Sequence, residues 1–288
     1  MVVLTIREAL VNASDYLKKK GADTFRLDAE VLLAYSLGRD RTYLYREALR
    51  TLTCTELCSY RSLIKRRGAG EPVAYIVGNK EFMGLDFMVS PFCLIPRPET
   101  ELLVQTALAL LVDWPVQPIA VDVGTGSGAI AVSLAYYGPP DLTVHATDLS
   151  LTALACAIAN GERCGVKVHW HHGDLLTPLK GVLNDGEKAA VITANLPYIA
   201  SRQMPELPKS VRLYEPALAL DGGIDGLELY RRVIPHAYDL LAPQGALLME
   251  ISPEQNDLTV ALLNPLHWQV DVVHDLSGAV RMVRGVKR

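Results

Sequence analysis

The sequence Asn-Leu-Pro-Tyr at residues 195–198 combines groups that suit one kind of chemistry. The side-chain oxygen of Asn195 and the backbone carbonyl of Leu196 accept hydrogen bonds, Pro197 stiffens the turn, and the Tyr198 ring can lie against a planar group. Two acceptors can hold both hydrogens of a planar –NH2 group and so direct its weakly nucleophilic nitrogen. The turn therefore predicts a site that binds such a nitrogen. We assign no separate general base to the reaction. Asn195 or Tyr198 alone would be an ordinary turn or packing residue.

The sequence "DVGTGSGAI" is a second candidate site. Gly124, Gly126 and Gly128 allow the backbone to turn sharply and approach a ligand, and the helix expected after them offers free N–H groups. Asp148 ends the next expected strand about 20 residues later, where a carboxylate can hold ribose hydroxyls. The pattern fits a nicotinamide dinucleotide as well as S-adenosylmethionine, and close packing of a helix on a strand is a third interpretation.

The turn at residues 195–198 distinguishes the two cofactors. A dehydrogenase has no particular use for it, whereas methyl transfer from a sulfonium to a planar nitrogen needs alignment of the nitrogen. The sulfonium is already a good leaving group, so alignment can supply much of the catalysis. Together the two motifs predict an S-adenosylmethionine-dependent methyltransferase that acts on an amide or amino nitrogen.

A mostly parallel sheet must position these residues. From residue 119 onward, apolar runs alternate with helical patterns, which predicts an α/β fold with strands in "IAVDVG", "LTVHATD", "VKVHWHH", "AAVITAN" and "GALLMEI". The closing "WQVDVVHDLSGAVRMVRGV" predicts two strands joined at Ser277-Gly278, an antiparallel C-terminal edge. In such Rossmann-like sheets, ligands bind at the carboxyl ends of the strands.

The first 70 residues have a different pattern, that of a small helical domain. Thr5 with Glu8, and Thr53 with Glu56, have capping-box spacing at the starts of two helices. This domain carries no catalytic constellation, so we expect it to recognise a protein substrate. A β-hairpin linker is expected at residues 71–94 and the methyltransferase domain at 95–288.

Basic residues end the second of these helices at Lys65, Arg66 and Arg67. They could contact nucleic acid, but cations in a last helical turn also complement the helix dipole, and we favour that interpretation. A net charge of −4 offers little long-range attraction for a phosphate backbone. We expect no direct binding of nucleic acid.

Composition limits the remaining possibilities. The 288 residues are 50% hydrophobic, and no apolar run approaches the roughly 18 residues of a membrane span, so we expect no membrane contact and a cytoplasmic location. The five cysteines never form Cys-x-x-Cys, which disfavours a structural zinc site. In "HWHH" at residues 169–172, adjacent side chains of a strand would point to opposite faces, so no metal site is expected.

Taken together, these motifs resemble the protein glutamine N5-methyltransferases of the HemK/PrmC family. The resemblance runs from about residue 71 to the C-terminus and lies in "EPVAYIVGNKEFMGLDF", "LIPRPETELLV", "DVGTGSGAIA", "ATDLS", "GDLLTPL", "NLPYI", "YEPALALDGGIDGL" and "DLSGAVRMV". Residues 1–70 match in helical character only.

The resemblance implies a cofactor, a substrate and roles for individual residues. The cofactor is S-adenosylmethionine, and the substrate is the glutamine of the Gly-Gly-Gln tripeptide in peptide-chain release factors. Asp148 would hold the ribose, Asp174 and Leu175 the adenine, and the turn from Asn195 to Tyr198 the substrate glutamine, with Asn195 also bordering the cofactor. The methionine portion would lie on the glycine loop, formed by Gly124, Thr125, Gly126, Ser127 and Gly128.

One departure from the family lies in the turn itself. The usual sequence is Asn-Pro-Pro-Tyr, and Leu196 takes the second position here, which keeps the backbone carbonyl but costs rigidity. Adenine N6-methylation of DNA or RNA, and glutamine methylation of a ribosomal protein, are alternative reactions. A noncatalytic cofactor-binding protein is the alternative from another class.

Two further segments have open interpretations. Arg97, Glu99, Thr100 and Glu101 either line the active site or begin a helix with acidic residues in its first turn. Residues 199–226 are long for a connection, which predicts a flap or substrate-binding loop, with a disordered insertion as the alternative.

Overall fold

The computed structural model describes residues 4–183 and 187–288. The chain forms two compact units: one, here called the helical unit, contains Met1–Asn79 and Pro208–Tyr214, and the other, the sheet unit, contains Lys80–Leu207 and Glu215–Arg288. Residues 1–3 of the expected helical domain lie outside the described residues. Within the described residues, no helix is both long and apolar enough to cross a membrane.

Two of the helices in the helical unit, α1 (Ile6–Lys19) and α4 (Cys54–Gly68), begin where the sequence predicted. The other main helices of the unit are α2 (Phe25–Leu37) and α3 (Arg41–Arg46). Capping boxes at Thr5 with Glu8 and at Thr53 with Glu56 are confirmed. The core includes Tyr60, which is 2% exposed and whose hydroxyl donates to the Ala29 carbonyl at 3.0 Å.

Two of the three cations at the end of α4 form ion pairs inside the helical unit. Arg67 Nε lies 2.7 Å from Asp28 Oδ2, and Arg66 Nη2 lies 2.5 Å from Glu71 Oε1. These pairs agree with the helix-end interpretation of the basic run.

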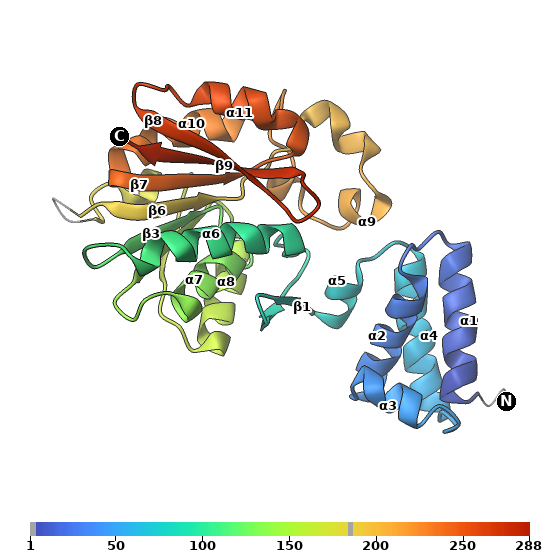
Figure 1. Ribbon diagram of the computed structural model, residues 1–288. Helices are drawn as coiled ribbons and strands as arrows, with labels where there is room; N and C mark the ends of the chain where they lie inside the picture. The colour runs from blue at the N-terminus through green and yellow to red at the C-terminus, as the bar shows by residue number, and fades with distance from the viewer. Residues whose placement is uncertain (1–3, 184–186) are drawn as a thin grey trace. The chain divides into compact units, whose positions relative to one another are not determined.

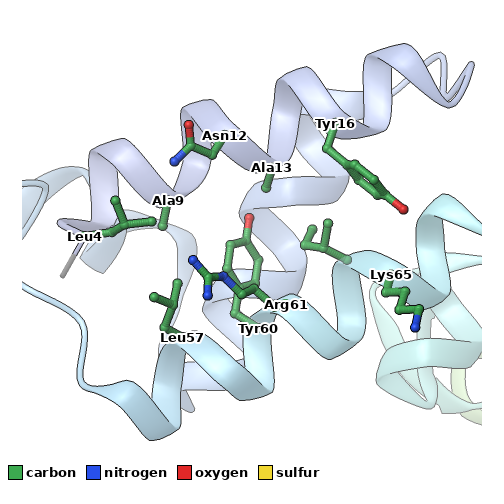
Figure 2. A pocket seen from close by; sticks show the side chains of 10 residues that line it. Leu4, Ala9, Asn12, Ala13, Tyr16, Leu57, Tyr60, Arg61 and Lys65 are labelled. Carbon is green, nitrogen blue, oxygen red and sulfur yellow. The ribbon is translucent and has the colours of Figure 1, made fainter. Parts of the chain in front are cut away.

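A hollow lies between α1 and α4 in the helical unit. Figure 2 shows side chains of both helices around it, most of them apolar, with Arg61 and Lys65 contributed by α4. The residues that line it are Leu4, Ala9, Asn12, Ala13, Tyr16, Leu57, Tyr60, Arg61, Ile64 and Lys65.

The hairpin expected within residues 71–94 is shorter than predicted. It consists of β1 (Asn79–Phe82) and β2 (Leu85–Met88), whereas the preceding residues form a short helix, α5 (Val73–Val77). Pro72 precedes this helix in an extended conformation, and Gly78 ends it with a left-handed φ of 73°. The alternating pattern was wrong for residues 73–77 because both helix boundaries are set by Pro and Gly.

The sheet unit contains the predicted strands. These are β3 (Ile119–Val123), β4 (Thr143–Asp148), β5 (His169–His172), β6 (Ala189–Ala194), β7 (Leu241–Glu250), β8 (Trp268–His274) and β9 (Val280–Lys287). Their order is β5-β4-β3-β6-β7-β9-β8, with β9 antiparallel to both of its neighbours and the other pairs parallel. The mostly parallel sheet with an antiparallel C-terminal edge is confirmed.

Helices cover both faces of this sheet (Figure 1). One face carries α6 (Glu101–Val112), α7 (Ala129–Tyr137) and α8 (Leu151–Cys164), and the other carries α10 (Glu228–Leu240) and α11 (Asn256–Leu262). Successive strand residues point to opposite faces. In β3, Val121 and Val123 accordingly pack with Tyr230 of α10, whereas Ala120 packs with Val104 of α6.

Residues 199–226 hold several short helices. These are η3 (Ser201–Glu206), α9 (Lys209–Arg212) and η4 (Ala217–Ala219). The ends of the segment are joined, because the Ile199 N–H donates to the Leu220 carbonyl at 3.1 Å and the Gly222 N–H donates to the Ile199 carbonyl at 2.8 Å. A role for this segment in substrate binding stays a prediction.

Candidate functional site

A pocket of the sheet unit lies where β3, β4 and β6 end. Because parallel strands end at the same edge, residues that follow different strands meet there. Most of the residues singled out from the sequence are brought together in it. Its lining consists of Phe92, Cys93, Leu94, Gly124, Gly126, Thr147, Asp148, Leu149, Ser150, Ala153, Asp174, Leu175, Asn195, Leu196, Pro197, Pro216, Leu218, Ala219, Leu229 and Arg232.

The three glycines of the loop have different surroundings. Gly126 has a φ of 57° and lines the pocket, and a Cβ atom there would meet nothing within 4 Å. At Gly128, whose φ is 81°, a Cβ atom would lie 3.0 Å from Ala157 Cβ. Gly126 therefore leaves space for a ligand, whereas Gly128 allows close packing of α7 and α8, the structural interpretation considered from the sequence.

The rest of the glycine loop faces the protein interior. Thr125 and Ser127 are buried and, like Gly128, do not line the pocket. Beneath the loop lies Asp122, which is fully buried and whose Oδ1 accepts a hydrogen bond from Thr193 Oγ1 at 2.9 Å. Burial raises the pKa of Asp122 to about 6. Sequence reasoning assigned this carboxyl group no role, although it is the first residue of the "DVGTGSGAI" motif.

Asp148 ties the loop to the end of β4. Its Oδ2 accepts from the Gly126 N–H and its Oδ1 from the Ser150 N–H, both at 2.8 Å. Burial raises the pKa of Asp148, and the hydrogen bonds from Ser150 and Gly126 oppose that shift. Each carboxylate oxygen can accept a further hydrogen bond, so Asp148 keeps capacity for two hydroxyl groups in the pocket.

Asp174 and Leu175 lie in the wall of the same pocket. The Asp174 carboxylate forms an ion pair with Arg232 of α10, which also lines the pocket. Leu175 has a φ of 49°, a left-handed conformation that is uncommon for a residue with a side chain. Arg232 was missed because nothing in its local sequence distinguishes it from an exposed helix residue.

The turn after β6 presents three of its four residues to the pocket. Asn195, Leu196 and Pro197 line it, whereas Tyr198 does not. The Leu196 side chain is 3% exposed, and a Cβ atom at Gly124 would lie 2.9 Å from its Cδ2. Packing against the glycine loop therefore holds the turn at the position where the family usually has proline.

The Tyr198 side chain is partly buried against the apolar cluster that contains Tyr230, and it does not line the pocket. Burial raises its pKa to about 12, so the phenol keeps its proton at neutral pH. Its backbone carbonyl accepts from Gln255 Nε2 at 2.8 Å. Direct contact of the Tyr198 ring with a substrate stays a prediction.

Residues 97–101 follow one of the two interpretations left open by the sequence, the start of a helix, and they contact residues of the site only from outside the pocket. They begin a helix, since η1 (Pro98–Thr100) leads into α6. Yet Thr100 Oγ1 accepts a hydrogen bond from Asn195 Nδ2 at 3.1 Å, and Arg97 Nη2 lies 2.5 Å from the buried carboxylate of Glu215. None of the residues from 97 to 101 lines the pocket itself.

The histidines of β5 form a ring stack with a neighbour on β4. His145 Nδ1 lies 3.0 Å from His171 Nε2, and the ring of His145 stacks on those of His169 and His171. Burial lowers the pKa of His145 to about 4, which keeps the imidazole neutral. Across residues 4–183 and 187–288, no group of three or more side chains is arranged to hold a metal ion.

Two family models match this chain. The PrmC N-terminal domain matches residues 8–78, and a methyltransferase domain matches residues 120–215. The first covers most of the helical unit, and the second covers β3 to β6 with the pocket residues that follow them.

Proteins of known family match nearly the whole chain. The release factor glutamine methyltransferase of Moorella thermoacetica is 43% identical over 289 residues, covering 99% of both chains. The chain belongs to this family of release factor glutamine methyltransferases. The member from Geobacter sulfurreducens is 39% identical over 98% of this chain and 97% of its own. The resemblance inferred from the sequence motifs is confirmed.

A solved structure supports the fold. A methyltransferase from Pyrococcus furiosus matches 79% of this chain and 97% of its own at 18% identity, with a TM-score of 0.50. The α/β methyltransferase fold expected from the strand pattern is confirmed.

Proposed function

We propose that this protein transfers a methyl group from S-adenosylmethionine to the side-chain amide nitrogen, N5, of the glutamine in the Gly-Gly-Gln tripeptide of release factors. One observation carries the proposal: Asn195, Leu196 and Pro197 border the same pocket as Gly126 and Asp148. The residues that can align a planar nitrogen therefore border the same pocket as the residues that can bind a nucleoside.

The pocket residues fit the cofactor. Gly126 leaves open space beside the loop, Asp148 has spare acceptor capacity for the ribose hydroxyls, and Leu175 offers an apolar surface for the adenine next to Asp174. When bound, S-adenosylmethionine supplies a methyl group on a good leaving group. Thr125, Ser127 and Gly128 shape the loop from its buried side.

The turn orients the substrate amide. Asn195 Oδ1 and the Leu196 carbonyl accept hydrogen bonds from the two hydrogens of the –NH2 group, which points its nitrogen toward the cofactor. Pro197 restricts the backbone, and the buried Leu196 side chain anchors the turn. Alignment is the main catalytic contribution of these residues.

The helical unit docks the release factor. A glutamine on a flexible loop enters a pocket without unstacking, whereas an adenine in a duplex must be extruded, at a cost normally offset by contacts from a basic surface. The cations Arg66 and Arg67 are already held in ion pairs. Protein is therefore the better substrate class, which also fits a cytoplasmic location.

A parallel incubation tests this function. Labelled S-adenosylmethionine is mixed with an intact release factor, with the same factor carrying alanine in place of its Gly-Gly-Gln glutamine, or with adenine-rich DNA. We expect label on the first substrate and little on the other two. Label on the DNA, or equal label on both forms of the factor, would overturn the proposal.

A further inference from the structure

The Asn195 side chain can align a substrate amide in only one of its two orientations. Its carboxamide has an acceptor, Oδ1, and a double donor, Nδ2, and half a turn about the last side-chain bond exchanges them. A reacting –NH2 group is itself a donor, so it requires Oδ1 in front of it. A reversed Asn195 would direct its own hydrogens toward those of the substrate. The orientation of this amide must therefore be fixed.

Thr100 alone cannot fix the orientation. Its Oγ1 lies 3.1 Å from Asn195 Nδ2 and accepts a hydrogen bond from it. A hydroxyl can also donate, so it could equally bind the Oδ1 of a reversed amide. Thr100 selects the productive orientation only when its own hydrogen is engaged elsewhere.

Glu250 is placed to engage that hydrogen. It is the last residue of β7, and Met249 before it pairs with Ala194, so Glu250 and Asn195 follow neighbouring positions of two parallel strands. Burial raises the pKa of the Glu250 carboxyl group, and Thr100 and Asn195 lie close enough to it for their side chains to lower that pKa by a smaller amount. Thr100 and Glu250 are each 4% exposed. Among the described residues, Glu250 Oε2 has no hydrogen-bond partner.

We propose that Glu250 and Thr100 are positioning residues that hold the Asn195 carboxamide with Oδ1 available to the substrate nitrogen, an inference that rests on the proposed function. An ionised carboxylate only accepts hydrogen bonds, so Glu250 takes the hydroxyl hydrogen of Thr100. Thr100 Oγ1 is then an acceptor for Asn195 Nδ2. Neither residue lines the pocket, so both act through Asn195.

The backbone around this group is held by Tyr230. Its buried hydroxyl lies 3.2 Å from the Ala194 carbonyl oxygen and also hydrogen-bonds to the Glu250 carbonyl. The phenol thus links the ends of β6 and β7. The distance between Asn195 and Glu250 is therefore set by the sheet and not by flexible loops.

Protonation of Glu250 removes the preference for one orientation of the Asn195 carboxamide. Burial raises its pKa to about 7, and below that pH the carboxyl group carries a hydrogen that it can donate to Thr100. The polar and charged groups that face it are Thr100, Asn195, Glu99, Arg281, Tyr198 and Tyr230. Burial also raises the pKa of both tyrosines, so they stay neutral through this range. The rate of methyl transfer should rise as the pH increases through about 7.

Thr100 variants form the first test. Thr100→Val keeps the size of the side chain and removes the hydroxyl, whereas Thr100→Ser keeps the hydroxyl. With labelled cofactor and an intact release factor, we expect Thr100→Val to lower kcat by about tenfold or more, because the aligned acceptor is lost. KM for the release factor and the calorimetric cofactor affinity should stay within about twofold of wild type. Thr100→Ser should restore most of kcat. A normal kcat in Thr100→Val would overturn the inference.

Glu250→Gln forms the second test. This variant should lower kcat at high pH by about tenfold and abolish the rise in rate between about pH 6 and 8, because glutamine does not titrate. Cofactor affinity and thermal melting are measured beside it to show that the sheet unit is intact. A variant that kept both the wild-type kcat and the wild-type pH profile would overturn the inference.

A readout independent of activity separates this inference from the proposed function. The side-chain NH2 signals of Asn195 in a nitrogen NMR spectrum should titrate with a midpoint near pH 7 in the wild-type protein, and this titration should be absent in Glu250→Gln. Signals of Asn195 that do not change with pH would overturn the positioning role even if release factors are methylated. A protein that shows the titration but methylates no release factor would contradict the proposed function alone.

Discussion

The helical unit and the sheet unit each contain a hollow, and the two are built from different parts of the chain. The hollow between α1 and α4 is lined almost entirely by helix side chains, and its ten lining residues include no carboxylate (Figure 2). The pocket of the sheet unit is lined by the glycine loop, by residues at three strand ends and by the carboxylates Asp148 and Asp174. The first offers mostly apolar contact area, whereas the second offers hydrogen-bonding groups in fixed directions.

The difference matches what the two proposed functions, methyl transfer and docking of a release factor, would each require. Alignment of a reacting nitrogen depends on groups held in set directions, which parallel strands provide because they end at one edge. Docking of a protein depends on surface, which helices provide. Substitutions in the sheet unit should therefore change the rate or the cofactor affinity, and changes in the helical unit should affect only the use of the protein substrate.

Asn195→Ala should have the largest effect. Loss of the acceptor that aligns the nitrogen should lower the rate of methyl transfer by on the order of a hundredfold or more. Single-turnover transfer from labelled cofactor measures this rate, and circular dichroism checks that the fold persists. A variant with near-normal turnover would remove Asn195 from its proposed role.

Asp148→Ala should have the second-largest effect. We expect its cofactor affinity to fall by about 1.5–3 kcal/mol, because charge-assisted hydrogen bonds to the ribose are lost. Calorimetry with the cofactor measures the change. Asp148→Asn is the matched control, since it keeps the size and one acceptor but gives up the charge, and its affinity should lie between those of alanine and wild type. Unchanged affinity in both variants would exclude Asp148 from the cofactor site.

Removal of residues 1–70 tests whether the helical unit contributes to the use of the protein substrate. Methylation of an intact release factor should fall by about tenfold or more, because docking no longer concentrates the glutamine at the pocket. Calorimetric cofactor affinity should stay within about twofold. If cofactor binding were lost together with methylation, the assignment of docking and chemistry to separate units would be wrong.

Leu196→Pro should have the smallest effect. Proline restores the usual family sequence but replaces a buried side chain that packs against Gly124. We expect a rate within about threefold of wild type and a free energy of unfolding lowered by about 1 kcal/mol. Thermal melting of this variant and of Leu196→Ala measures the loss. Greater stability in Leu196→Pro than in wild type would show that ring rigidity outweighs side-chain packing.

The sequence predicted those features whose signals are local. The strands β3, β4 and β6 were recognisable because each contains a short run of mostly apolar residues. The glycine loop, Asp148 and Asn195 were recognisable because each stands where such a run ends. The capping boxes were recognisable from residues three positions apart. In each case the physical cause of the structure lies within a few neighbouring residues.

The features that were missed, or in the case of Thr100 left open, depend on tertiary structure. Thr100 precedes Asn195 by 95 positions and contacts it because α6 packs on the sheet beside β6. Glu250 reaches the same place only through the pairing of β6 with β7, and Arg232 through the packing of α10. The sequence pattern around each of them is typical of a helix start, a strand end or an exposed helix face. Their role is visible only when the order of the strands is known.

The segment Pro208–Tyr214 belongs to the helical unit although the residues on both sides of it belong to the sheet unit. Within the helical unit, the Tyr214 hydroxyl lies 3.5 Å from the Ala69 carbonyl oxygen. A recombination event that replaced only the gene segment for residues 1–79 would therefore leave the original residues 208–214 to pack against helices from another protein. A single crossover cannot exchange the whole helical unit, because the unit contains two separate stretches of the chain. Replacement of the whole helical unit has to change two separate stretches of the sequence, residues 1–79 and 208–214.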